Sequence, residues 1–502
     1  MPYKNVNKKP SVICISATDP MGLSGVHADM RALASMDVHG MACITATTAQ
    51  NERGFYQLNP VSDDAFFSQL DALVGMANCH VIKIGLLANA RQAEILITHD
   101  VFKNKSIILD PVLAASSGSI EQYENRLAGI LNLLPHVDLL TPNMNEAKAL
   151  LGAEIDQHES VEELAQQFLD KGVNATLLKG GHTDEPSLDF YCAQDIQFYL
   201  KHEIFEHQYN RGTGCAMASL IAAGLALGAT MGDAVTMAKM QMQTGWQSPF
   251  CVSQNNGSLG FKKWMTAEYC SLNEISQLDV NLPQVFKAQS ESQLTFPACD
   301  QPLGLYPIFE RASWLERLLP LGIKVAQLRV KDLNGEDLKN EIQMAMNIAK
   351  QYDCQLFIND YWQLAIECNA YGVHLGQEDI DDADLQAISE AGLRLGLSSH
   401  CFYEVARAKT INPSYIAFGP VYETQSKDMP WVPQGPVGLS YWRKHLPNKP
   451  MVAIGGIHGK RFAQVKQTGV DAIAMITAIT EAHSAEEAVN QYMAEFNHSS
   501  AY

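Results

Sequence analysis

Residues 303–331 read LGLYPIFERASWLERLLPLGIKVAQLRVK, in which two strand-like runs, 304–309 and 325–330, flank a segment with helical periodicity. The same alternation continues towards the C-terminus. It gives eight strand-like runs in all: GLYPIF, VAQLRV, QLFIN, GVHL, LGLS, YIAFG, MVAIG and AIAMI. Eight strand–helix units within about 200 residues are typical of a compact (β/α)8 barrel. We therefore predict a TIM barrel over residues 302–498.

The N-terminal half shows a second alternation of short β-branched runs with helical patterns. Its strand-like runs are SVICIS, CITATT, VIKIG, SIILD, DLLTP and ATLLKGG. This pattern predicts a mostly parallel sheet with helices on both faces, a three-layer αβα domain over residues 10–271. No segment of the first half repeats in the second, so the two domains are unlike. Residues 272–301 between them are polar and show no sustained period, and we expect a linker or an irregular packed connection there.

Bulk composition restricts the classes of function. The chain has 502 residues, more than one ordinary core accommodates. Its formal charge of −19 argues against nucleic acid and anionic membranes as partners, since both require a basic face. The eleven cysteines are dispersed, which fits a reducing cytoplasm and no metal–thiolate site. No signal peptide is expected at the N-terminus, and the apolar stretch MASLIAAGLALGA predicts a buried helix rather than a membrane span.

The segment RGTGCAMAS at 211–219 predicts a phosphate-binding turn that opens a helix. Gly212 and Gly214 let the backbone approach an anion, and the N–H groups of a helix start could hold the charge on a transferring phosphoryl group. Cys215 falls in the first helical turn. No Gly-Lys-Ser/Thr follows, so the segment is not a Walker loop, and taken alone it equally suits a helix that merely starts after a glycine turn.

Other polar residues of the first domain lie at or just beyond strand ends, where parallel sheets bind ligands. The Gln50 amide could read a heterocycle through paired donor and acceptor groups. Asp110, Asn143 and Glu146 are placed for contacts with Mg²⁺ or phosphate, and Lys179 could neutralise phosphate.

Strand ends of the barrel carry a second set of candidate residues. Arg329, Lys331 and Lys427, together with the carboxylates Asp360 and Asp379, suit a diphosphate held by Mg²⁺. A single strand-end Asp or Asn is more often a cap, but a ring of such groups is harder to explain structurally. The glycines after the seventh strand and the backbone at the eighth suit a separate phosphate.

Eight motifs of the first domain together resemble the hydroxymethylpyrimidine/phosphomethylpyrimidine kinases of thiamine synthesis, which have a ribokinase-like fold. They occur in the order ATDP, HADMRAL, TATTAQN, KIGLL, LDPV, TPNMNEA, KGGH and GTGC. The resemblance implies two ATP-dependent phosphorylations of one pyrimidine alcohol, first to the monophosphate and then to the diphosphate. It implies pyrimidine recognition by Gln50, ATP and Mg²⁺ contacts around Asp110, Glu146 and Lys179, and an active-site role for Cys215.

Two positions depart from that family. Gly22-Leu23-Ser24-Gly25 stands where the family usually has Gly-Gly-Ala-Gly, and Leu23 does not easily adopt a positive φ. Arg211 stands where the family usually has His. Its guanidinium either adds phosphate affinity or points to solvent, and we expect the second.

Cys215 at a helix start suggests a specific role. Because a helix N-terminus lowers a thiol pKa, we expect Cys215 to accept the proton of the pyrimidine hydroxyl. The monophosphate is already ionised, so Cys215 should matter more for the first phosphorylation than for the second; the alternative is an orienting or packing role.

The barrel motifs QLRVKD, FIND, GVHLGQED, GLSSH, GPVYETQSK and AIGGI resemble thiamine-phosphate synthase. The resemblance implies that Asp360 and Asp379 hold Mg²⁺ while a pyrimidine diphosphate loses diphosphate and the thiazole nitrogen traps the resulting cation. The implied pyrimidine-diphosphate ligands are Gln327, Leu328, Arg329, Val330, Lys331, Asn359, Ser398 and Lys427. The implied thiazole-phosphate ligands are Thr424, Gln425, Ser426, Gly455, Gly456, Ile476 and Thr477.

Both resemblances point to one pathway, so we expect a bifunctional, cytoplasmic enzyme of thiamine biosynthesis. It would use hydroxymethylpyrimidine, ATP, Mg²⁺ and thiazole phosphate, and its oligomeric state stays open. A pyridoxal-type kinase fused to a thiazole tautomerase-like barrel is the first alternative, but such kinases usually carry Asp where Cys215 stands. A phosphate-ligand sensor is the second, but the charged site residues are all present.

Overall fold

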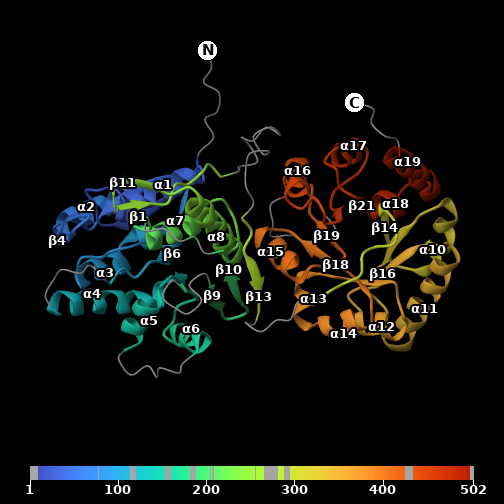
Figure 1. Cartoon of the computed structure of the whole chain (residues 1–502), viewed down its shortest axis with the longest axis horizontal. Coiled ribbons are helices and arrows are strands. Elements are labelled where there is room, and N and C mark those ends of the chain that lie inside the picture. Colours follow the sequence, from blue (N-terminus) through green and yellow to red (C-terminus); the bar gives the residue numbers. More distant parts are fainter. Residues whose placement is uncertain are drawn as a thin grey trace, which may run out of the picture. The chain divides into compact units, whose positions relative to one another are not determined.

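The computed structural model describes residues 9–76, 78–113, 120–152, 160–180, 188–203, 205, 209–254, 256–264, 281–287, 294–423 and 433–497. These residues form two compact units (Figure 1). The first unit contains the described residues up to 264 together with 281–287, and the second contains those from 294 onwards.

A nine-stranded sheet forms the centre of the first unit, in the order β13-β10-β9-β8-β7-β6-β5-β1-β2. Neighbours from β2 to β8 run parallel, and β9, β10 and β13 extend the sheet antiparallel. All six strand-like runs expected from the sequence contribute to strands. The bounds are β1 Ser11–Ser16, β2 His39–Ile44, β5 Cys79–Ile84, β6 Ser106–Leu109, β7 Leu139–Leu140, β8 Ala175–Leu178, β9 Leu188–Ala193, β10 Gln197–Lys201 and β13 Gln284–Phe286.

Helices cover both faces of this sheet, which confirms the three-layer αβα arrangement. In Figure 1, α1 lies above the sheet and α3 to α6 lie below it. Helix α7 packs against α1, α8, β1 and β5, while α6 packs against β8 and β9. Since both faces are covered, strand residues such as Val12 and Ile13 are fully buried. The bounds are α1 Gly25–Ser35, α2 Asp63–Asp71, α3 Ala90–Thr98, α4 Ile120–Leu133, α5 Met144–Leu151, α6 Val161–Asp170, α7 Thr213–Ala226 and α8 Met231–Gln247, with 3₁₀ turns at Asp100–Phe102 and Leu134–His136.

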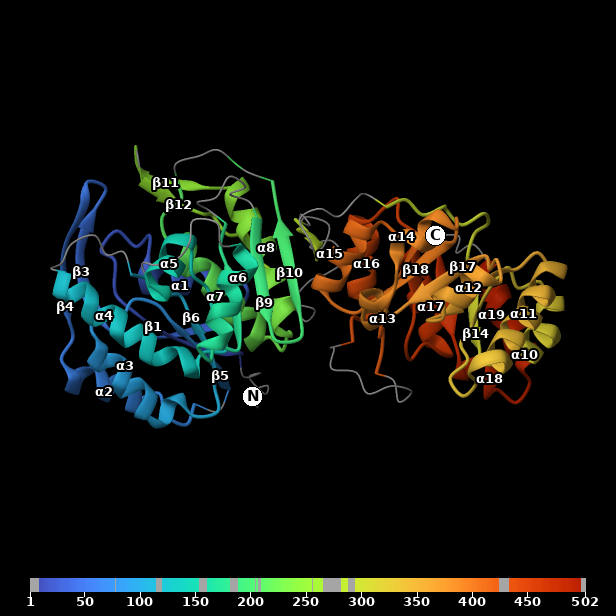
Figure 2. The same cartoon turned by 90° about the horizontal axis from the view of Figure 1, so that it is seen from below.

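Two hairpins stand apart from the large sheet. The run CITATT divides at Thr45, whose hydroxyl donates to the Leu86 carbonyl at 2.7 Å. The chain then forms the hairpin of β3 (Ala46–Asn51) and β4 (Gly54–Pro60), which projects from one end of the unit (Figure 2). The second hairpin pairs β11 (Phe250–Ser253) with β12 (Asn256–Ser258).

Strand β13 falls inside the segment expected to be a linker. It pairs antiparallel with β10, Val285 is 1% exposed, and the Phe286 ring stacks on Tyr199 with centroids 5.8 Å apart. Part of the connection is therefore an edge strand of the first unit. A strand of only three residues is too short to show a period in the sequence.

Eight parallel strands close into a barrel in the second unit, as expected. Each strand-like run matches one strand, and Tyr306, Phe357 and Tyr415 pack in the barrel interior. The strands are β14 Gly304–Phe309, β15 Val325–Leu328, β16 Gln355–Asn359, β17 Gly372–Leu375, β18 Arg394–Ser399, β19 Tyr415–Phe418, β20 Met451–Ala453 and β21 Ala472–Met475.

The helices around the barrel are α10 Ala312–Leu318, α11 Gly335–Gln351, α12 Trp362–Glu367, α13 Gln377–Asp382, α14 Leu385–Glu390, α15 Phe402–Ile411, α16 Gly435–His445, α17 Lys460–Lys466, α18 Thr477–Thr480 and α19 Ala485–Asn497, with a 3₁₀ turn at Leu319–Leu321. Among the residues that the structure describes, no helix combines the length and apolarity needed to cross a membrane. The apolar stretch MASLIAAGLALGA lies largely in α7, and residues 215–224 are buried.

Candidate active sites

The start of α7 packs tightly against the rest of the first unit. Gly212 has φ +74°, and a Cβ there would overlap the carbonyl oxygen of Leu23. A Cβ on Gly214 would lie 3.3 Å from Lys179 Nζ and 3.6 Å from both carboxylate oxygens of Asp110. The glycine turn therefore faces the Lys179–Asp110 pair, and glycine lets the backbone come this close.

Lys179 and Asp110 form an ion pair at 3.0 Å, and Asp110 is 2% exposed. The pKa of Glu146 is raised to about 7, chiefly by burial, with Lys179 opposing the shift and Asp110 adding to it. Burial would lower the pKa of Lys179, but the two carboxylates raise it overall, so the ammonium stays charged. Two carboxyl groups beside one ammonium leave an acidic surplus, which suits a divalent cation bound together with phosphate.

Asn143 has a structural role in the described fold. Its side chain accepts from Glu146 N at 2.9 Å, and Glu146 Oε2 accepts from Asn143 N at 2.8 Å, which forms a capping box at the start of α5. The described residues contain no cluster of three or more His, Cys, Asp or Glu able to hold a metal. A Mg²⁺ ion in this unit would therefore need phosphate or water oxygens to complete its coordination.

The Cys215 thiol is buried, and burial raises its pKa to about 12. Asp110 and Asp29 also raise this pKa, while Lys83 and the Gly25 backbone N–H lower it. The expectation that the helix start lowers the pKa of Cys215 is therefore wrong, because desolvation outweighs the helix terminus. Cys215 is a neutral thiol near pH 7.

A buried ion pair adjoins this thiol and was not singled out from the sequence. Lys83 Nζ lies 2.8 Å from Asp29 Oδ1, and the side chains of both residues are fully buried. Ser219 on α7 donates to the same oxygen at 2.8 Å. Two features of the sequence could have indicated this pair: a lysine within the apolar run VIKIG, and an aspartate on the inner face of α1. Such a pair is stable only because each charge meets its partner.

Gln50 and Arg211 contact each other. The Nη2 atom of Arg211 donates to Gln50 Oε1 at 2.7 Å, and Gln50 Nε2 donates to Thr48 Oγ1 at 3.0 Å. The expectation that Arg211 points to solvent is therefore wrong.

The loop between β1 and α1 accommodates Leu23 without strain. The positive φ angles fall on Gly22 (+69°) and Gly25 (+55°) and not on Leu23, whose side chain is 1% exposed. The Asp19 carboxylate accepts from the backbone N–H groups of Met21, Leu23 and Ser24 and so fixes the loop.

The two expected metal ligands of the barrel lie together. Lys331 Nζ is 2.6 Å from Asp360 Oδ2, and Gly376 N donates to Asp379 Oδ2 at 3.0 Å. Burial raises the pKa of Asp379, and the neighbouring Asp360 carboxylate raises it further. Two carboxylates held this close repel each other, and a divalent cation would relieve that repulsion.

A buried hydrogen-bonded chain runs from Ser398 into the barrel. Ser398 Oγ lies 2.9 Å from His374 Nε2, and His374 Nδ1 lies 2.8 Å from the Tyr415 hydroxyl, which in turn lies 2.8 Å from that of Tyr306. Gln327 also hydrogen-bonds to Tyr306. Burial lowers the pKa of His374 to about 4, so its imidazole is neutral. The sequence predicted Ser398 and Gln327 but missed His374, which lies inside GVHL without a polar neighbour.

The remaining expected ligand residues of the barrel differ in how exposed their side chains are. Leu328, Val330 and Asn359 are buried, whereas Arg329 and Lys331 are exposed. Ile476 precedes α18 and Thr477 opens it. The expected ligands Thr424, Gln425, Ser426 and Lys427 lie outside the described residues.

Gly455 and Gly456 have positive φ angles of +102° and +65°. A Cβ on Gly455 would lie 2.8 Å from Pro420 Cα, and one on Gly456 would lie 2.7 Å from the Glu423 carbonyl oxygen. The two glycines therefore hold the segment that follows β19 close to β20.

Comparison with known proteins identifies both units. The family described as phosphomethylpyrimidine kinase matches residues 19–260, and that described as thiamine monophosphate synthase matches 306–479. The thiamine-phosphate synthase of Yersinia pseudotuberculosis serotype O:1b is 49% identical over 198 residues, which are 39% of this chain and 92% of that protein. The thiamine-phosphate synthase of Serratia proteamaculans is 52% identical over 187 residues, 37% of this chain and 88% of that protein.

Among solved structures, the pyridoxal kinase from Staphylococcus aureus in complex with ADP has a TM-score of 0.49 and 22% identity, covering 56% of this chain and all of that one. The phosphomethylpyrimidine kinase from Clostridium difficile has a TM-score of 0.39 and 24% identity, covering 46% of this chain and 99% of that one. The matches to the two families fall on either side of the boundary between the two units. The chain therefore belongs to the thiamine-phosphate synthase family through its barrel, to which it joins a phosphomethylpyrimidine kinase domain in one bifunctional enzyme.

Proposed function

We propose that the first unit phosphorylates 4-amino-5-hydroxymethyl-2-methylpyrimidine with ATP, first to the monophosphate and then to the diphosphate. The barrel then couples this diphosphate with thiazole phosphate and releases thiamine phosphate and diphosphate. The observation that carries the proposal is that each unit gathers its own anion-binding set: the α7 turn with Lys179 and Asp110, and Lys331 with Asp360 and Asp379.

In the kinase unit, the N–H groups at the start of α7 and the Lys179 ammonium stabilise the charge on the transferred phosphoryl group. Asp110 and Glu146 would hold Mg²⁺, which neutralises phosphate charge when bound. Gln50 orients the pyrimidine. Cys215 keeps its proton and orients the reacting groups. The hydroxyl proton passes to an oxygen of the transferred phosphoryl group as the new P–O bond forms and the bond to ADP breaks.

In the barrel, Asp360 and Asp379 would hold Mg²⁺, which supplies charge neutralisation for the diphosphate leaving group. Arg329 and Lys331 bind the same group, and Ser398 orients the pyrimidine. The other proposed pyrimidine-diphosphate ligands are Gln327, Leu328, Val330, Asn359 and Lys427. The proposed thiazole-phosphate ligands are Gly455, Gly456, Ile476 and Thr477, with Thr424, Gln425 and Ser426.

The match to thiamine monophosphate synthase favours this function over a pyridoxal-type kinase fused to a tautomerase-like barrel. The proposed location is the cytoplasm, since all ten cysteines among the described residues are free thiols.

The test supplies hydroxymethylpyrimidine, ATP, Mg²⁺ and thiazole phosphate to the pure full-length protein. We expect thiamine phosphate, detected by chromatography after oxidation to its fluorescent thiochrome. Replacing hydroxymethylpyrimidine and ATP by the pyrimidine diphosphate should bypass the first unit and still give product. If the pyrimidine diphosphate gives no thiamine phosphate, the barrel does not have the proposed activity. If the pyrimidine diphosphate gives product but the mixture with hydroxymethylpyrimidine and ATP does not, the first unit does not have the proposed kinase activity.

A further inference from the structure

Arg211 connects two parts of the kinase unit that are far apart in the sequence. It lies directly before the glycine turn of α7, and its guanidinium reaches Gln50 on β3, 161 residues away, at 2.7 Å. Both residues are half-buried.

The backbone of Arg211 is fixed on both sides by β12. Its N–H donates to the Gly257 carbonyl at 3.2 Å, and its own carbonyl accepts from Ser258 Oγ at 2.7 Å. The guanidinium therefore extends from an anchored point, so less conformational entropy is lost when it binds Gln50.

The hydrogen bonds from Arg211 form a chain with one direction. Arg211 donates to Gln50 Oε1, Gln50 Nε2 donates to Thr48 Oγ1 at 3.0 Å, and Thr48 Oγ1 donates to the Thr18 carbonyl at 2.7 Å. A guanidinium has donors only, so the oxygen of the Gln50 amide must face it. The Thr48 hydroxyl donates its one hydrogen to the Thr18 carbonyl, so towards Gln50 it can act only as an acceptor. The chain therefore fixes which end of the amide is oxygen and which is nitrogen.

We propose that Arg211 is a positioning residue that determines how Gln50 reads the heterocycle. This inference rests on the proposed function of the kinase unit. With its oxygen bound to a cation and one N–H bound to Thr48, Gln50 retains an N–H hydrogen for a ligand. Polarisation along the chain strengthens that donor. The site therefore selects a ring that presents an unprotonated acceptor nitrogen, such as an aminopyrimidine.

The competing role for Arg211 is a direct contact with phosphate. A contact with the substrate's own phosphate would help only the monophosphate, because the alcohol has no phosphate. A contact with an ATP phosphate would instead raise the KM for ATP in both steps on substitution. Orientation of Gln50 would help both substrates, because they share the same ring. The two steps of the kinase therefore distinguish the two roles.

The experiment measures kcat and KM for the alcohol, the monophosphate and ATP with the full-length protein and its Arg211→Ala variant. We expect KM for both pyrimidines to rise about tenfold, the effect of one misdirected hydrogen bond, with kcat and the KM for ATP within about twofold of wild type. Arg211→Lys, which restores a cationic donor, should recover part of the loss. In a Gln50→Ala background, Arg211→Ala should add less than about twofold.

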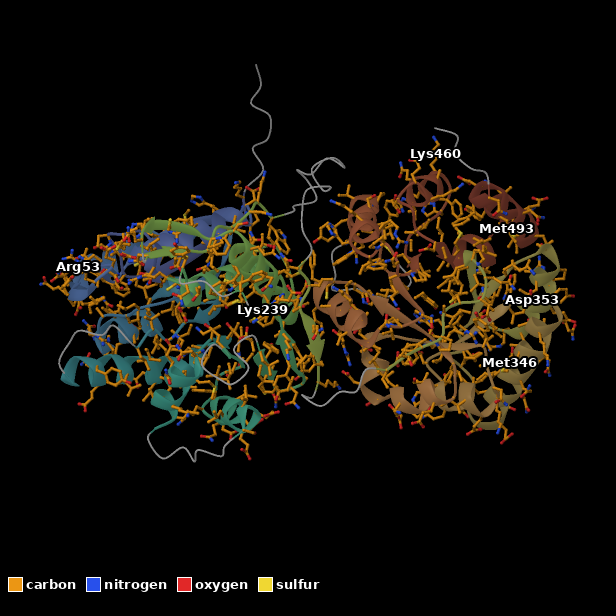
Figure 3. All side chains as sticks on the ribbon, viewed as in Figure 1. Arg53, Lys239, Met346, Asp353, Lys460 and Met493 are labelled. Carbon is orange, nitrogen blue, oxygen red and sulfur yellow. The ribbon has the colours of Figure 1, made fainter. Side chains whose placement is uncertain are left out.

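Arg53→Ala is the matched control, because Arg53 is exposed in the turn of the same β3–β4 hairpin (Figure 3). Its kinetic constants should equal those of wild type. A rise in KM confined to the monophosphate, or a fall in kcat with unchanged KM, would overturn the inference. The inference would also be overturned if Arg211→Ala had the same kinetic constants as a wild-type enzyme that phosphorylates both pyrimidines. If the wild-type enzyme phosphorylates neither pyrimidine, the proposed kinase function itself is refuted.

Discussion

Cys215 shows how burial changes the chemistry of a residue. A thiol with a pKa of about 12 has a thiolate fraction on the order of 10⁻⁴ at pH 8. We therefore predict that Cys215→Ala slows the two phosphorylations by similar factors, because a thiol that keeps its proton does not serve as a base in either step. The rates are measured separately with the alcohol and with the monophosphate as substrate.

Alkylation of Cys215 gives an independent check. Its rate, followed by mass spectrometry of the peptide, should keep rising about tenfold per pH unit up to pH 10, since thiolate is the reactive form. Cys251, exposed on β11, controls for reagent quality. A plateau below pH 9, or a loss confined to the first phosphorylation, would restore the base role that the sequence suggested.

His374 makes the stability of the barrel depend on pH. In the unfolded chain the His374 imidazole has a pKa near 6.5, whereas in the folded barrel its pKa is about 4. Between these values the unfolded state binds more protons, so the free energy of unfolding falls as the pH falls, by about 1.4 kcal/mol per pH unit at most. Pulse proteolysis in urea, following the barrel fragment, measures this dependence.

His374→Asn is the comparison variant for that measurement. It should be less stable than wild type at pH 7.5, because the Ser398 and Tyr415 hydroxyls lose their partner, and the difference should shrink towards pH 4.5. Equal pH slopes for the two proteins would show that His374 is not the residue responsible.

At the scale of elements, β13 shows that the connection between the units contributes to the kinase core. Val285 is 1% exposed, whereas Gln284 beside it is exposed. We predict that Val285→Ala lowers the stability of the kinase unit by about 1–2 kcal/mol through lost burial, while Gln284→Ala is near neutral. The midpoint for thermal loss of kinase activity measures both.

Synthase activity provides the internal control for β13. It should survive heating equally in wild type and in both variants, since β13 pairs with β10 of the first unit. If Val285→Ala has the same kinase midpoint as Gln284→Ala, residues 284–286 contribute only a linker.

Long, regular elements could be predicted because their signal is local. The barrel strands and β1 lie where the apolar runs stand in the sequence, since burial on both faces requires such runs. The structure of the segment CITATT was harder to predict, because a run of β-branched residues does not show that the chain leaves the sheet at Thr45. That break depends on the bond from Thr45 to Leu86, which are 41 residues apart.

At the scale of the whole molecule, we predict that the two activities can be separated. Cys215→Ala should impair phosphorylation and leave the coupling of added pyrimidine diphosphate unchanged, and Asp360→Asn should do the reverse. Asn is chosen because residue 360 has φ +67°, which Asn tolerates. Both activities are assayed on each variant, and a variant that loses both would show that the sites depend on each other.

The sequence by itself determined two unlike α/β domains, a closed eight-stranded barrel, and the polar residue types at the strand ends. Those properties follow from periodicity and composition within short segments. Tertiary structure alone decided that Cys215 keeps its proton, that Lys83 pairs with Asp29, and that Arg211 holds Gln50. The physical reason is that a pKa, a buried ion pair or a directed hydrogen bond depends on which distant segments meet and how much water remains between them, and neither property is encoded locally in the chain.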